Sequence, residues 1–415
     1  MLIHSAVQVL TLAGGPQRGS RLGDLGLIED GAILIRSGNI LETGRSSDLL
    51  NKYPDEETLD VGGKVVLPGF VDPHTHVIWA GDRSAEFELR LQGKSYLEIM
   101  EAGGGIVSTV RETRKASLKQ LKDQTRSRLK RMLAHGTTTL EAKTGYGLNS
   151  ETELLMLQAL LELDQEEPLD IVLTFLGAHA VPPEYEGNTP GYTDLVCREM
   201  IPALAEWWPA QTKDSFPYVD VFCETGAFDV DQSRQILETA KANGFPIKIH
   251  ADEFDNLGGV GLAVELGAAS ADHMVVTSPE DIKALGGSNT VAVALPCTPF
   301  GLAESDYTPA KEIVEAGGIL AIATDLNPGT AWCESMQFAV ALACRYMKLT
   351  PKQAIAAATI NAAAAIGMDK KVGSLEPGKQ ADIIVLNIPD YRHIGYRFGT
   401  NLVEIVIKQG QVYQG

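Results

Sequence analysis

The segment VDPHTHVIWAGDR, residues 71–83, carries two histidines, His74 and His76, directly after a short apolar run. Residues i and i+2 of a β-strand project to the same face about 6.5 Å apart, so both imidazoles can bind one metal ion. Two histidines at the end of a buried strand would need other polar partners if no metal were present. The pair therefore predicts a metal site at the end of a buried strand.

Outward from this segment, short apolar runs alternate with helical stretches between residues 67 and 367. The runs predict eight strands, at residues 69–76, 137–144, 171–179, 219–224, 247–252, 271–274, 291–296 and 320–325. The helices between them carry start signals such as Ser150 followed by Glu153, the spacing of a capping box. Eight parallel strands, each buried on both faces and followed by a helix, close into an α/β fold, the (β/α)8 TIM barrel.

The two ends of the chain have a different sequence pattern, which is typical of β-strands. Residues 1–66 contain short β-branched runs such as VQVLTL and GAILIRSG, which predict small antiparallel strands and carry no helix signal. The same pattern of β-branched runs occurs after residue 367, in QADIIVLNI and LVEIVIKQGQVYQ. We expect residues 1–66 and 368–415 to form one small β-sandwich domain, with the barrel domain of residues 67–367 inserted between its halves.

The composition excludes several functional classes. Asp and Glu number 54 against 35 Lys and Arg, a net charge of −19, so the protein repels nucleic acids and anionic membranes. No stretch reaches the ~18 apolar residues of a membrane-spanning helix, and five cysteines without a C-x-x-C pair are typical of reduced thiols. We expect a cytoplasmic homodimer without nucleic-acid or membrane partners, in which any anionic ligand meets a local cation. The basic run between Lys115 and Arg131 is interpreted as the solvated face of a helix.

Active sites of such barrels lie at the carboxyl ends of the strands. The polar residues predicted at those ends are His74, His76, His179, His250, His273 and Asp325. Three of the histidines, His74, His76 and His250, together with Asp325 make a set of nitrogen and oxygen ligands that suits Zn²⁺ or iron. Taken singly, His250 and Asp325 are as compatible with structural roles as with metal binding.

Two further features bear on the chemistry of this site. Glu253, three residues after His250, and His273 are predicted to move protons beside the metal, with a loop carboxylate and a core histidine as the structural alternatives. The fourth strand ends at Glu224 and has no lysine at its tip. A carbamylated lysine that bridges two ions is therefore not indicated, and we expect one metal ion per subunit.

Several segments resemble the amidohydrolase superfamily, whose members are metal-dependent hydrolases with a flanking β-sandwich. The segments are VDPHTHVIWAGDR, AGDRSAEFELRLQGKSYLEI, EAGGGIVSTVRETR, EAKTGYGL, GAHAVPPEY, VFCETGAF, IHADEFDNLGG, ATDLNPGT and GSLEPGKQADIIVL. Within the superfamily they look most like the members that open a five-membered imidazolone ring in histidine degradation. The resemblance implies metal ligands His74, His76, His250 and Asp325; catalytic Glu253, His273 and Asp325; and substrate contacts Arg83, Tyr96, Tyr146, His179, Glu253, Asn327, Gly329 and Thr330.

The implied reaction is hydrolysis of the ring C–N amide bond of 4-imidazolone-5-propanoate to N-formimidoyl-L-glutamate, with one Zn²⁺ or Fe³⁺ per subunit. Arg83 would bind the propionate carboxylate, and the division of proton transfer among Asp325, His273 and Glu253 stays open. Two stretches, LPCTPFGL and AWCES, depart from the family pattern. The alternatives are a related enzyme that deaminates or dechlorinates a neutral heterocycle, which would have little use for Arg83, and an inactive barrel that serves as an oligomeric scaffold.

Overall fold

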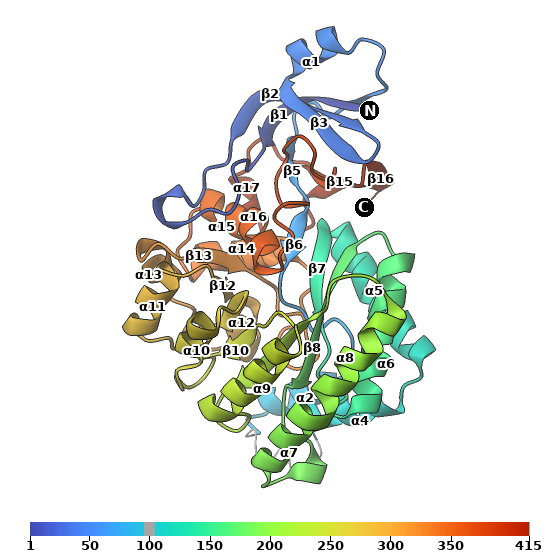
Figure 1. Cartoon of the computed structure of the whole chain (residues 1–415). Coiled ribbons are helices and arrows are strands. Elements are labelled where there is room, and N and C mark those ends of the chain that lie inside the picture. Colours follow the sequence, from blue (N-terminus) through green and yellow to red (C-terminus); the bar gives the residue numbers. More distant parts are fainter. Residues whose placement is uncertain (95–103, 415) are drawn as a thin grey trace.

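The computed structural model describes residues 1–94 and 104–414 and contains two sheets (Figure 1). One is an eight-stranded sheet whose neighbours follow chain order from β6 to β13. Its pairings are parallel, and its strands are β6 (Phe70–Asp72), β7 (Thr137–Lys143), β8 (Asp170–Ala178), β9 (Tyr218–Cys223), β10 (Ile249–Ala251), β11 (Ser270–His273), β12 (Val291–Ala294) and β13 (Ile319–Ile322). Each corresponds to one predicted strand, so the prediction of a TIM barrel is confirmed.

The barrel strands are apolar runs because both of their faces are covered. Every residue of β7, β12 and β13 is buried, as expected for parallel strands between a filled interior and an outer layer of helices. The seam between the last and first strands is joined just beyond the strand ends. There the amide of Asp325 donates to the carbonyl of His74 at 3.1 Å, and the amide of His76 donates to that of Leu326 at 2.9 Å.

The helices that surround the barrel and cover its ends begin and end at defined residues. They are α2 (Ser84–Leu91), α4 (Ile106–Lys115), α5 (Leu118–Ala134), α6 (Ser150–Glu166), α7 (Thr189–Leu195), α8 (Ile201–Gln211), α9 (Val230–Ala242), α10 (Gly259–Leu266), α11 (Pro279–Gly286), α12 (Cys297–Leu302), α13 (Ala310–Glu315), α14 (Met336–Arg345), α15 (Pro351–Ala357), α16 (Ile360–Ala365) and α17 (His393–Tyr396). Ser117 caps α5 through a capping box with Gln120, and Asp229 caps α9 in the same way.

The predicted capping box at the start of α6 is wrong. Asn149 is the N-cap, and its side chain accepts a hydrogen bond from the Thr152 amide at 2.8 Å. The buried Glu153 carboxylate turns instead to the preceding loop and accepts from the amides of Gly145, Gly147 and Leu148 at 3.0, 2.7 and 2.8 Å. A carboxylate that could complete a cap is thus used to hold the loop that follows β7.

The interpretation of the basic run as a solvated helix face is correct for most of α5 and wrong for one residue. Lys122 and Arg126 form ion pairs with acidic residues of α6 at the surface. Arg128 is only 3% exposed, and its guanidinium lies 3.3 Å from the centre of the Trp79 ring. It donates to the carbonyls of Val77 and Trp79 at 2.9 and 3.1 Å, which fixes the segment that follows the first barrel strand.

The second sheet unites the two ends of the chain, and we call it the terminal sheet. Its order is β16-β15-β14-β5-β1-β2-β3, with β4 paired to β1. The strands are β1 (Leu2–Leu10), β2 (Leu27–Arg36), β3 (Asn39–Arg45), β4 (Thr58–Asp60), β5 (Val65–Pro68), β14 (Ile383–Leu386), β15 (Val403–Lys408) and β16 (Gln411–Gln414). Buried aliphatic residues from both ends share one core, among them Ile33, Val66 and Ile383.

Two expectations for the N-terminal segment are wrong. β1 pairs in parallel with both β4 and β5, whereas only antiparallel strands were expected. A short helix, α1 (Ser46–Lys52), also follows β3 and buries Leu49 against the sheet. The parallel pairing arises because the chain runs through the β2–β3 hairpin and α1 before it returns along β1. A helix of seven residues is too short to show apolar periodicity.

The chain passes from the terminal sheet into the barrel at Gly69, between β5 and β6. A Cβ on Gly69 would lie 2.2 Å from the hydroxyl of Thr138, so the crossing requires a residue without a side chain. The terminal sheet lies at one end of the molecule, and α2 and α4 lie at the other (Figure 1). The domain boundaries at 66/67 and 367/368 stay a prediction. In the described part of the chain, no helix combines the length and apolarity needed to cross a membrane.

Candidate functional site

The predicted metal ligands converge at the carboxyl ends of the barrel strands. The Nε2 atoms of His76 and His250 lie 3.4 Å apart, and the Nε2 atoms of His74 and His76 each lie 3.5 Å from Oδ1 of Asp325. Ligands bonded to a tetrahedral zinc at 2.0–2.1 Å stand about 3.4 Å from one another. These three separations match those between ligands of one small cation. His74, His76 and Asp325 form one group with metal-ligand spacing, and His74, His250 and His273 form a second group that shares His74.

Two buried carboxylates orient the histidines. Nδ1 of His74 lies 2.7 Å from Oδ2 of Asp272, and Nδ1 of His250 lies 3.0 Å from Oδ2 of Asp220. Asp272 holds the ring proton of His74 on Nδ1 and leaves its Nε2 lone pair facing the centre of the cluster. Asp220 lies at ion-pair distance from Nδ1 of His250, an atom that makes no hydrogen bond with a described residue. Nε2 of His74 is buried and has no hydrogen-bond partner among the described residues. Lone pairs that face one another without a donor between them fit a site built for a metal ion.

Burial determines the protonation of the ligands. It holds the pKa of His74 and His76 well below the usual value, with neighbouring charges acting in the same direction, so both imidazoles are neutral and able to bind metal. Burial also raises the pKa of Asp325 to about 6, opposed by the Thr298 hydroxyl, which donates to Oδ2 of Asp325. The ligand set thus offers the neutral nitrogens of His74 and His76, the imidazole of His250 and one carboxylate.

The pair predicted to handle protons lies beside this cluster. Nδ1 of His273 is 3.5 Å from Oε2 of Glu253, and the His273 ring lies 5.3 Å from that of His250. Burial, with the nearby charge of Asp325, raises the pKa of Glu253 well above its usual range. The loop that carries Glu253 is held by Glu224, whose carboxylate accepts from the amides of Phe254 and Asp255 at 3.0 and 3.1 Å. Glu224 is therefore occupied by backbone amides.

His179 and Tyr146 form one wall of the site. The His179 ring stacks on His76 at 4.7 Å, and Tyr146 lies 5.3 Å from His179. Nδ1 of His179 donates to the carbonyl of Gly145 at 3.0 Å, while burial lowers the pKa of the imidazole to about 3. Gly145 has φ +108° and a Cβ there would lie 2.8 Å from Nδ1 of His179, which explains the glycine in this segment.

Arg83 is the cation at the edge of the site. Its Nε donates to Oε2 of Glu86 at 2.9 Å, and its Nη2 donates to Oε1 of the same carboxylate. Its Nη1 would lie 2.4 Å from a Cβ on Gly329, so the guanidinium rests directly against the loop that follows β13. Glu86 occupies Nε and Nη2, and Nη1 makes no hydrogen bond with a residue that the structure describes, so the Nη1 edge is available to another anion. Arg90 donates from Nη2 to the Gly329 carbonyl at 2.7 Å and secures the same loop.

The loop that follows β13 is organised by Asn327. Its Oδ1 accepts from the amides of Gly329 and Thr330, both at 2.8 Å, and its Nδ2 donates to the Asp325 carbonyl at 2.8 Å and to Oγ1 of Thr330 at 2.9 Å. The hydrogen-bonding capacity of the Asn327 side chain is thus used within the loop. The predicted substrate contacts of Asn327, Gly329 and Thr330 stay predictions, and Tyr96 lies outside the described residues.

Sequence reasoning missed a cluster of five charged side chains that are fully buried beneath the metal ligands. Its members are Glu141, Lys143, Asp220, Lys248 and Asp272. Each is a charged residue that interrupts an apolar strand, a signal visible in TLEAK, YVDVF, PIKIH and SADH. His74, Glu141 and Asp272 also have the spacing of metal ligands, but the ammonium groups of Lys143 and Lys248 already neutralise these carboxylates.

The two stretches that depart from the family pattern lie against each other. The Cys297 thiol, in LPCTPFGL, is in hydrogen-bonding contact with that of Cys333, in AWCES. A Cβ on Gly301 of α12 would lie 1.8 Å from the Thr330 carbonyl, so α12 packs directly on the loop after β13. The contact with Cys333 and burial together raise the pKa of Cys297 well above its usual value. The two departures from the family pattern therefore lie in neighbouring segments that pack against the loop carrying Asp325 and Thr330.

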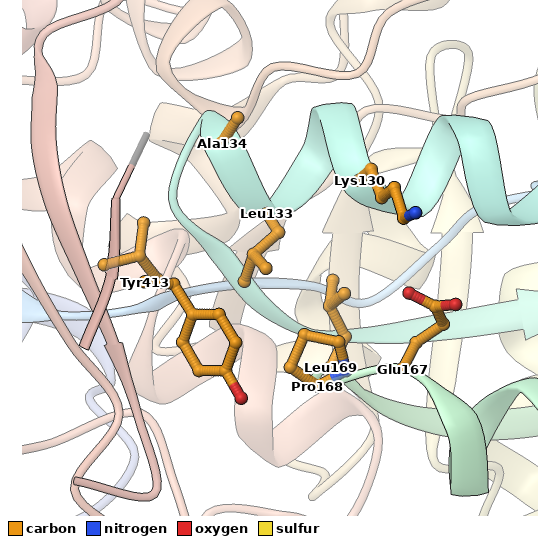
Figure 2. A pocket seen from close by; sticks show the side chains of 8 residues that line it. Lys130, Leu133, Ala134, Glu167, Pro168, Leu169 and Tyr413 are labelled. Carbon is orange, nitrogen blue, oxygen red and sulfur yellow. The ribbon is translucent and has the colours of Figure 1, made fainter. Parts of the chain in front are cut away.

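A cavity of about 330 Å³ lies at the opposite end of the barrel from the metal ligands. It is bounded by the end of α5, residues 167–169 before β8, and the terminal sheet. Figure 2 shows Leu133, Pro168, Leu169 and Tyr413 around it, with Lys130 and Glu167 beside them. Apart from Lys130 and Glu167 its lining lacks charged side chains, so the reaction is assigned to the metal cluster and not to this cavity.

Comparison with known sequences yields a consistent set of relatives. A family model described as "Amidohydrolase family" matches residues 65–413. An imidazolonepropionase from Herpetosiphon aurantiacus is 54% identical over 99% of this chain and 96% of the relative. An imidazolonepropionase from Geobacillus kaustophilus is 45% identical over 99% of this chain and 97% of the relative.

Solved structures with the same fold are more distant in sequence. Guanine deaminase from E. coli superposes with a TM-score of 0.74 at 15% identity and covers 100% of this chain and 99% of its own. A zinc-bound adenosine deaminase from Xanthomonas campestris gives a TM-score of 0.70 at 18% identity and covers 99% of this chain and 92% of its own. At these identities the structures establish the fold alone.

Proposed function

Because the chain belongs to the amidohydrolase family, and within it to the imidazolonepropionases, we propose that it hydrolyses 4-imidazolone-5-propanoate. Water adds to the ring carbonyl, the ring C–N amide bond breaks, and N-formimidoyl-L-glutamate is released. The observation that carries this proposal is the position of Arg83 at the edge of a cluster of three histidines and Asp325. A neutral heterocycle would leave the free Nη1 edge of Arg83 without a partner.

Arg83 and the aromatic wall would position the substrate. The carboxylate of the propionate arm binds the Nη1 edge of Arg83, which Glu86 holds in place. The ring then lies between the metal ligands and the wall formed by Tyr146 and His179. Nδ1 of His179 donates to a backbone carbonyl, so Nε2 of this neutral imidazole is free to accept a hydrogen bond from a ring N–H. Binding at the remote carboxylate thus orients the reacting carbonyl.

Proton transfer falls to three side chains beside the metal ligands. A Zn²⁺ or iron ion held by these ligands would supply Lewis acidity and lower the pKa of water to about 7. Asp325 and His273 are placed to take the proton of the attacking water. Burial raises the pKa of Glu253 and so favours its protonated form, in which it can hold a ring nitrogen and deliver a proton to it as the C–N bond breaks. His273 also lies where a developing oxyanion needs a donor.

One metal ion per chain is part of the proposal. The two groups with metal-ligand spacing, His74, His76, Asp325 and His74, His250, His273, share His74, which supports one centre. The neighbouring cluster of carboxylates already has two lysine ammonium groups as its cations. Neutral imidazoles with one carboxylate suit Zn²⁺ and iron alike. Elemental analysis of the purified protein is expected to give a stoichiometry near one ion per chain and to name the ion.

Loss of ultraviolet absorbance of freshly generated imidazolone propionate tests the function, with three variants compared with the wild type. His76→Ala is expected to lose the metal and the activity together. Arg83→Ala is expected to retain metal while KM for the acidic substrate rises at least tenfold. Arg198→Ala removes an arginine whose side chain is 78% exposed and serves as the matched control. Full activity of His76→Ala, or an unchanged KM in Arg83→Ala, would contradict the assignment.

We also propose that the chain acts as a cytoplasmic homodimer without nucleic-acid or membrane partners. The net charge of −19 and the five free cysteines support this proposal. Sedimentation equilibrium is expected to give twice the chain mass of 44.6 kDa. A mass equal to one chain across the micromolar range would refute the dimer and leave the reaction untouched.

A further inference from the structure

A lysine ammonium lies at the centre of the buried charges beneath the metal ligands. Nζ of Lys143 is 2.8 Å from Oδ2 of Asp220, 2.9 Å from Oε1 of Glu141 and 3.5 Å from Oδ2 of Asp272. All four side chains are 0% exposed. The proton-transfer scheme above makes no use of Lys143, although a fully buried charge is costly to retain.

Two of these carboxylates are the ones that orient metal ligands. Asp272 is hydrogen-bonded to Nδ1 of His74 at 2.7 Å, and Asp220 lies 3.0 Å from Nδ1 of His250, an ion-pair distance without hydrogen-bond geometry. The same oxygen atoms, Oδ2 of each aspartate, face the Lys143 ammonium. We propose that Lys143 is a positioning residue of the metal centre, which sets the orientation of both histidines through their aspartates. This inference rests on the metal site of the proposed function.

The physical reason is that one cation holds two anions in place. Asp220 and Asp272 carry like charges in a dry interior, where their repulsion is poorly screened. The ammonium offers three donors, enough to bind Glu141 and both aspartates at once. Without it the aspartates repel each other, and neither keeps the direction in which its Oδ2 meets an imidazole Nδ1. The Nε2 lone pairs of His74 and His250 would then no longer face a common centre.

Lys248 provides a matched control within the same cluster. It is also 0% exposed, and its Nζ donates to Oε2 of Glu141 at 2.8 Å and to the Pro73 carbonyl at 3.1 Å. Its Nζ lies 3.9 Å from Oδ2 of Asp272, and its ion pairs and hydrogen bonds with the described residues do not include Asp220. Replacing either lysine by methionine removes one buried positive charge of the same size, but only Lys143 touches the aspartate behind His250.

The first measurement is the Zn²⁺ affinity of the wild type, Lys143→Met and Lys248→Met, obtained by competition with a chelator. Changes to groups that hold a metal-ligating histidine lower metal affinity by about 10–100-fold. We expect a loss in that range for Lys143→Met and a loss below threefold for Lys248→Met, although both variants lower the melting temperature of the metal-free protein. Equal affinities of Lys143→Met and wild type would overturn the inference.

The second measurement needs neither metal nor activity. In metal-free protein labelled with ¹⁵N-histidine, the wild type is expected to show His74 and His250 protonated on Nδ1. Lys143→Met is expected to show mixed tautomers for both rings, and Lys248→Met the wild-type pattern. Two outcomes would contradict the inference. In the first, Lys143→Met keeps the wild-type tautomers; in the second, Lys248→Met shows the same mixture of tautomers as Lys143→Met. Either result would mean that Lys143 only contributes charge to the fold and does not orient the histidines.

A double variant keeps the inference testable if Lys143→Met does not fold. Lys143→Gln with Asp220→Asn removes one charge of each sign and is compared with Asp220→Asn alone. In the double variant we expect Lys143→Gln to mix the His74 tautomers through Asp272. Asp220→Asn alone is expected to affect only His250. An unchanged His74 in the double variant would overturn the inference. A wild-type protein that binds no Zn²⁺ or iron would instead refute the proposed function.

Discussion

Two residues of the candidate site adopt a backbone conformation that L-amino acids rarely use. Asp325 has φ +52° and His273 has φ +80°, both in the left-handed region. Non-glycine residues held there cost about 1–3 kcal/mol each, which the surrounding contacts must offset. For Asp325 these contacts include the hydrogen bonds from Thr298 and from Nδ2 of Asn327. The strain falls on one proposed ligand and one proposed proton-transfer group.

Asp325→Asn tests the ligand role without changing the shape of the side chain. Asparagine adopts the left-handed conformation more readily than most residues. The substitution also removes a buried carboxylate, whose pKa is raised to about 6 by burial. We expect Zn²⁺ affinity to fall at least tenfold, while the free energy of unfolding of the metal-free protein stays within about 1 kcal/mol of wild type or increases. Chelator competition and urea denaturation measure the two quantities. Asp123→Asn, at an exposed ion pair on α5, is the control, and wild-type affinity in Asp325→Asn would remove Asp325 from the ligand set.

At the scale of single residues, the sequence predicted the rim of the site better than its base. His179, His250 and Asp325 were predictable because each follows an apolar run, and the structure brings them to one rim. Asp220 and Lys143 were missed because each lies inside a strand, where a charged residue interrupts the apolar run that predicts a buried strand. Their partners come from other strands, Lys143 on β7 and Asp220 on β9, and such pairs depend on the closure of the barrel.

At the scale of elements, α5 shows why a charge pattern alone misplaces a residue. Arg126 and Arg131 pair with acids at the surface, and Arg128 lies between them in sequence. About half a turn of the helix separates Arg126 on the solvent face from Arg128 on the core face, and arginine stems are apolar enough to occupy either face. Trp79 provides the ring on which the guanidinium of Arg128 stacks. That partner follows the first barrel strand and is invisible to any analysis of α5 alone.

Arg128→Ala is expected to destabilise the protein by about 2–4 kcal/mol. The change removes two charge-assisted hydrogen bonds to backbone carbonyls and a buried stacking contact. Because these contacts are shielded from water, each contributes more to the free energy of unfolding than a comparable exposed contact. Urea denaturation measures the effect, and Lys130→Ala on the exposed side of α5 is expected to stay within about 0.5 kcal/mol of wild type. Equal effects of the two substitutions would show that Arg128 is as solvated as its neighbours.

The barrel strands were predictable as elements, whereas the pairing of the terminal sheet was not. β12 is a continuous apolar run because both faces are covered, so composition alone marks it, whereas β7 is equally buried but carries Glu141 and Lys143. The parallel pairing of β1 with β5 depends on the path of the chain through α1, which the local sequence does not encode. The cap of α6 failed for a similar reason, because Glu153 was taken by the loop that carries Gly145.

At the scale of the whole molecule, one buried lysine joins the terminal sheet to the barrel. Nζ of Lys408, on β15, lies 2.8 Å from Oδ2 of Asp170 at the start of β8 and 2.7 Å from Oδ2 of Asp382. Gln380 donates to the same two carboxylates at 2.8 and 2.9 Å. The side chain of Lys408 is 2% exposed. The amino ends of the barrel strands are thereby anchored to the sheet that both chain ends build.

Lys408→Met is expected to destabilise the protein in a pH-dependent way. Burial raises the pKa of Asp170, but the charge and hydrogen bond of Lys408, together with Lys371 and Gln380, keep the pKa below its usual value. A lowered carboxyl pKa adds stability above the unfolded pKa of about 4, and this stability is lost as the pH falls through the folded value. Without Lys408, Asp382 loses the ammonium at 2.7 Å and Asp170 retains only the more distant, half-exposed Lys371, so the loss should be about 3–5 kcal/mol at pH 7 and smaller near pH 4. Urea denaturation at pH 4, 5.5 and 7, with Lys370→Met as the exposed control, measures this trend, and a pH-independent loss would show that Lys408 acts through packing and not through its charge.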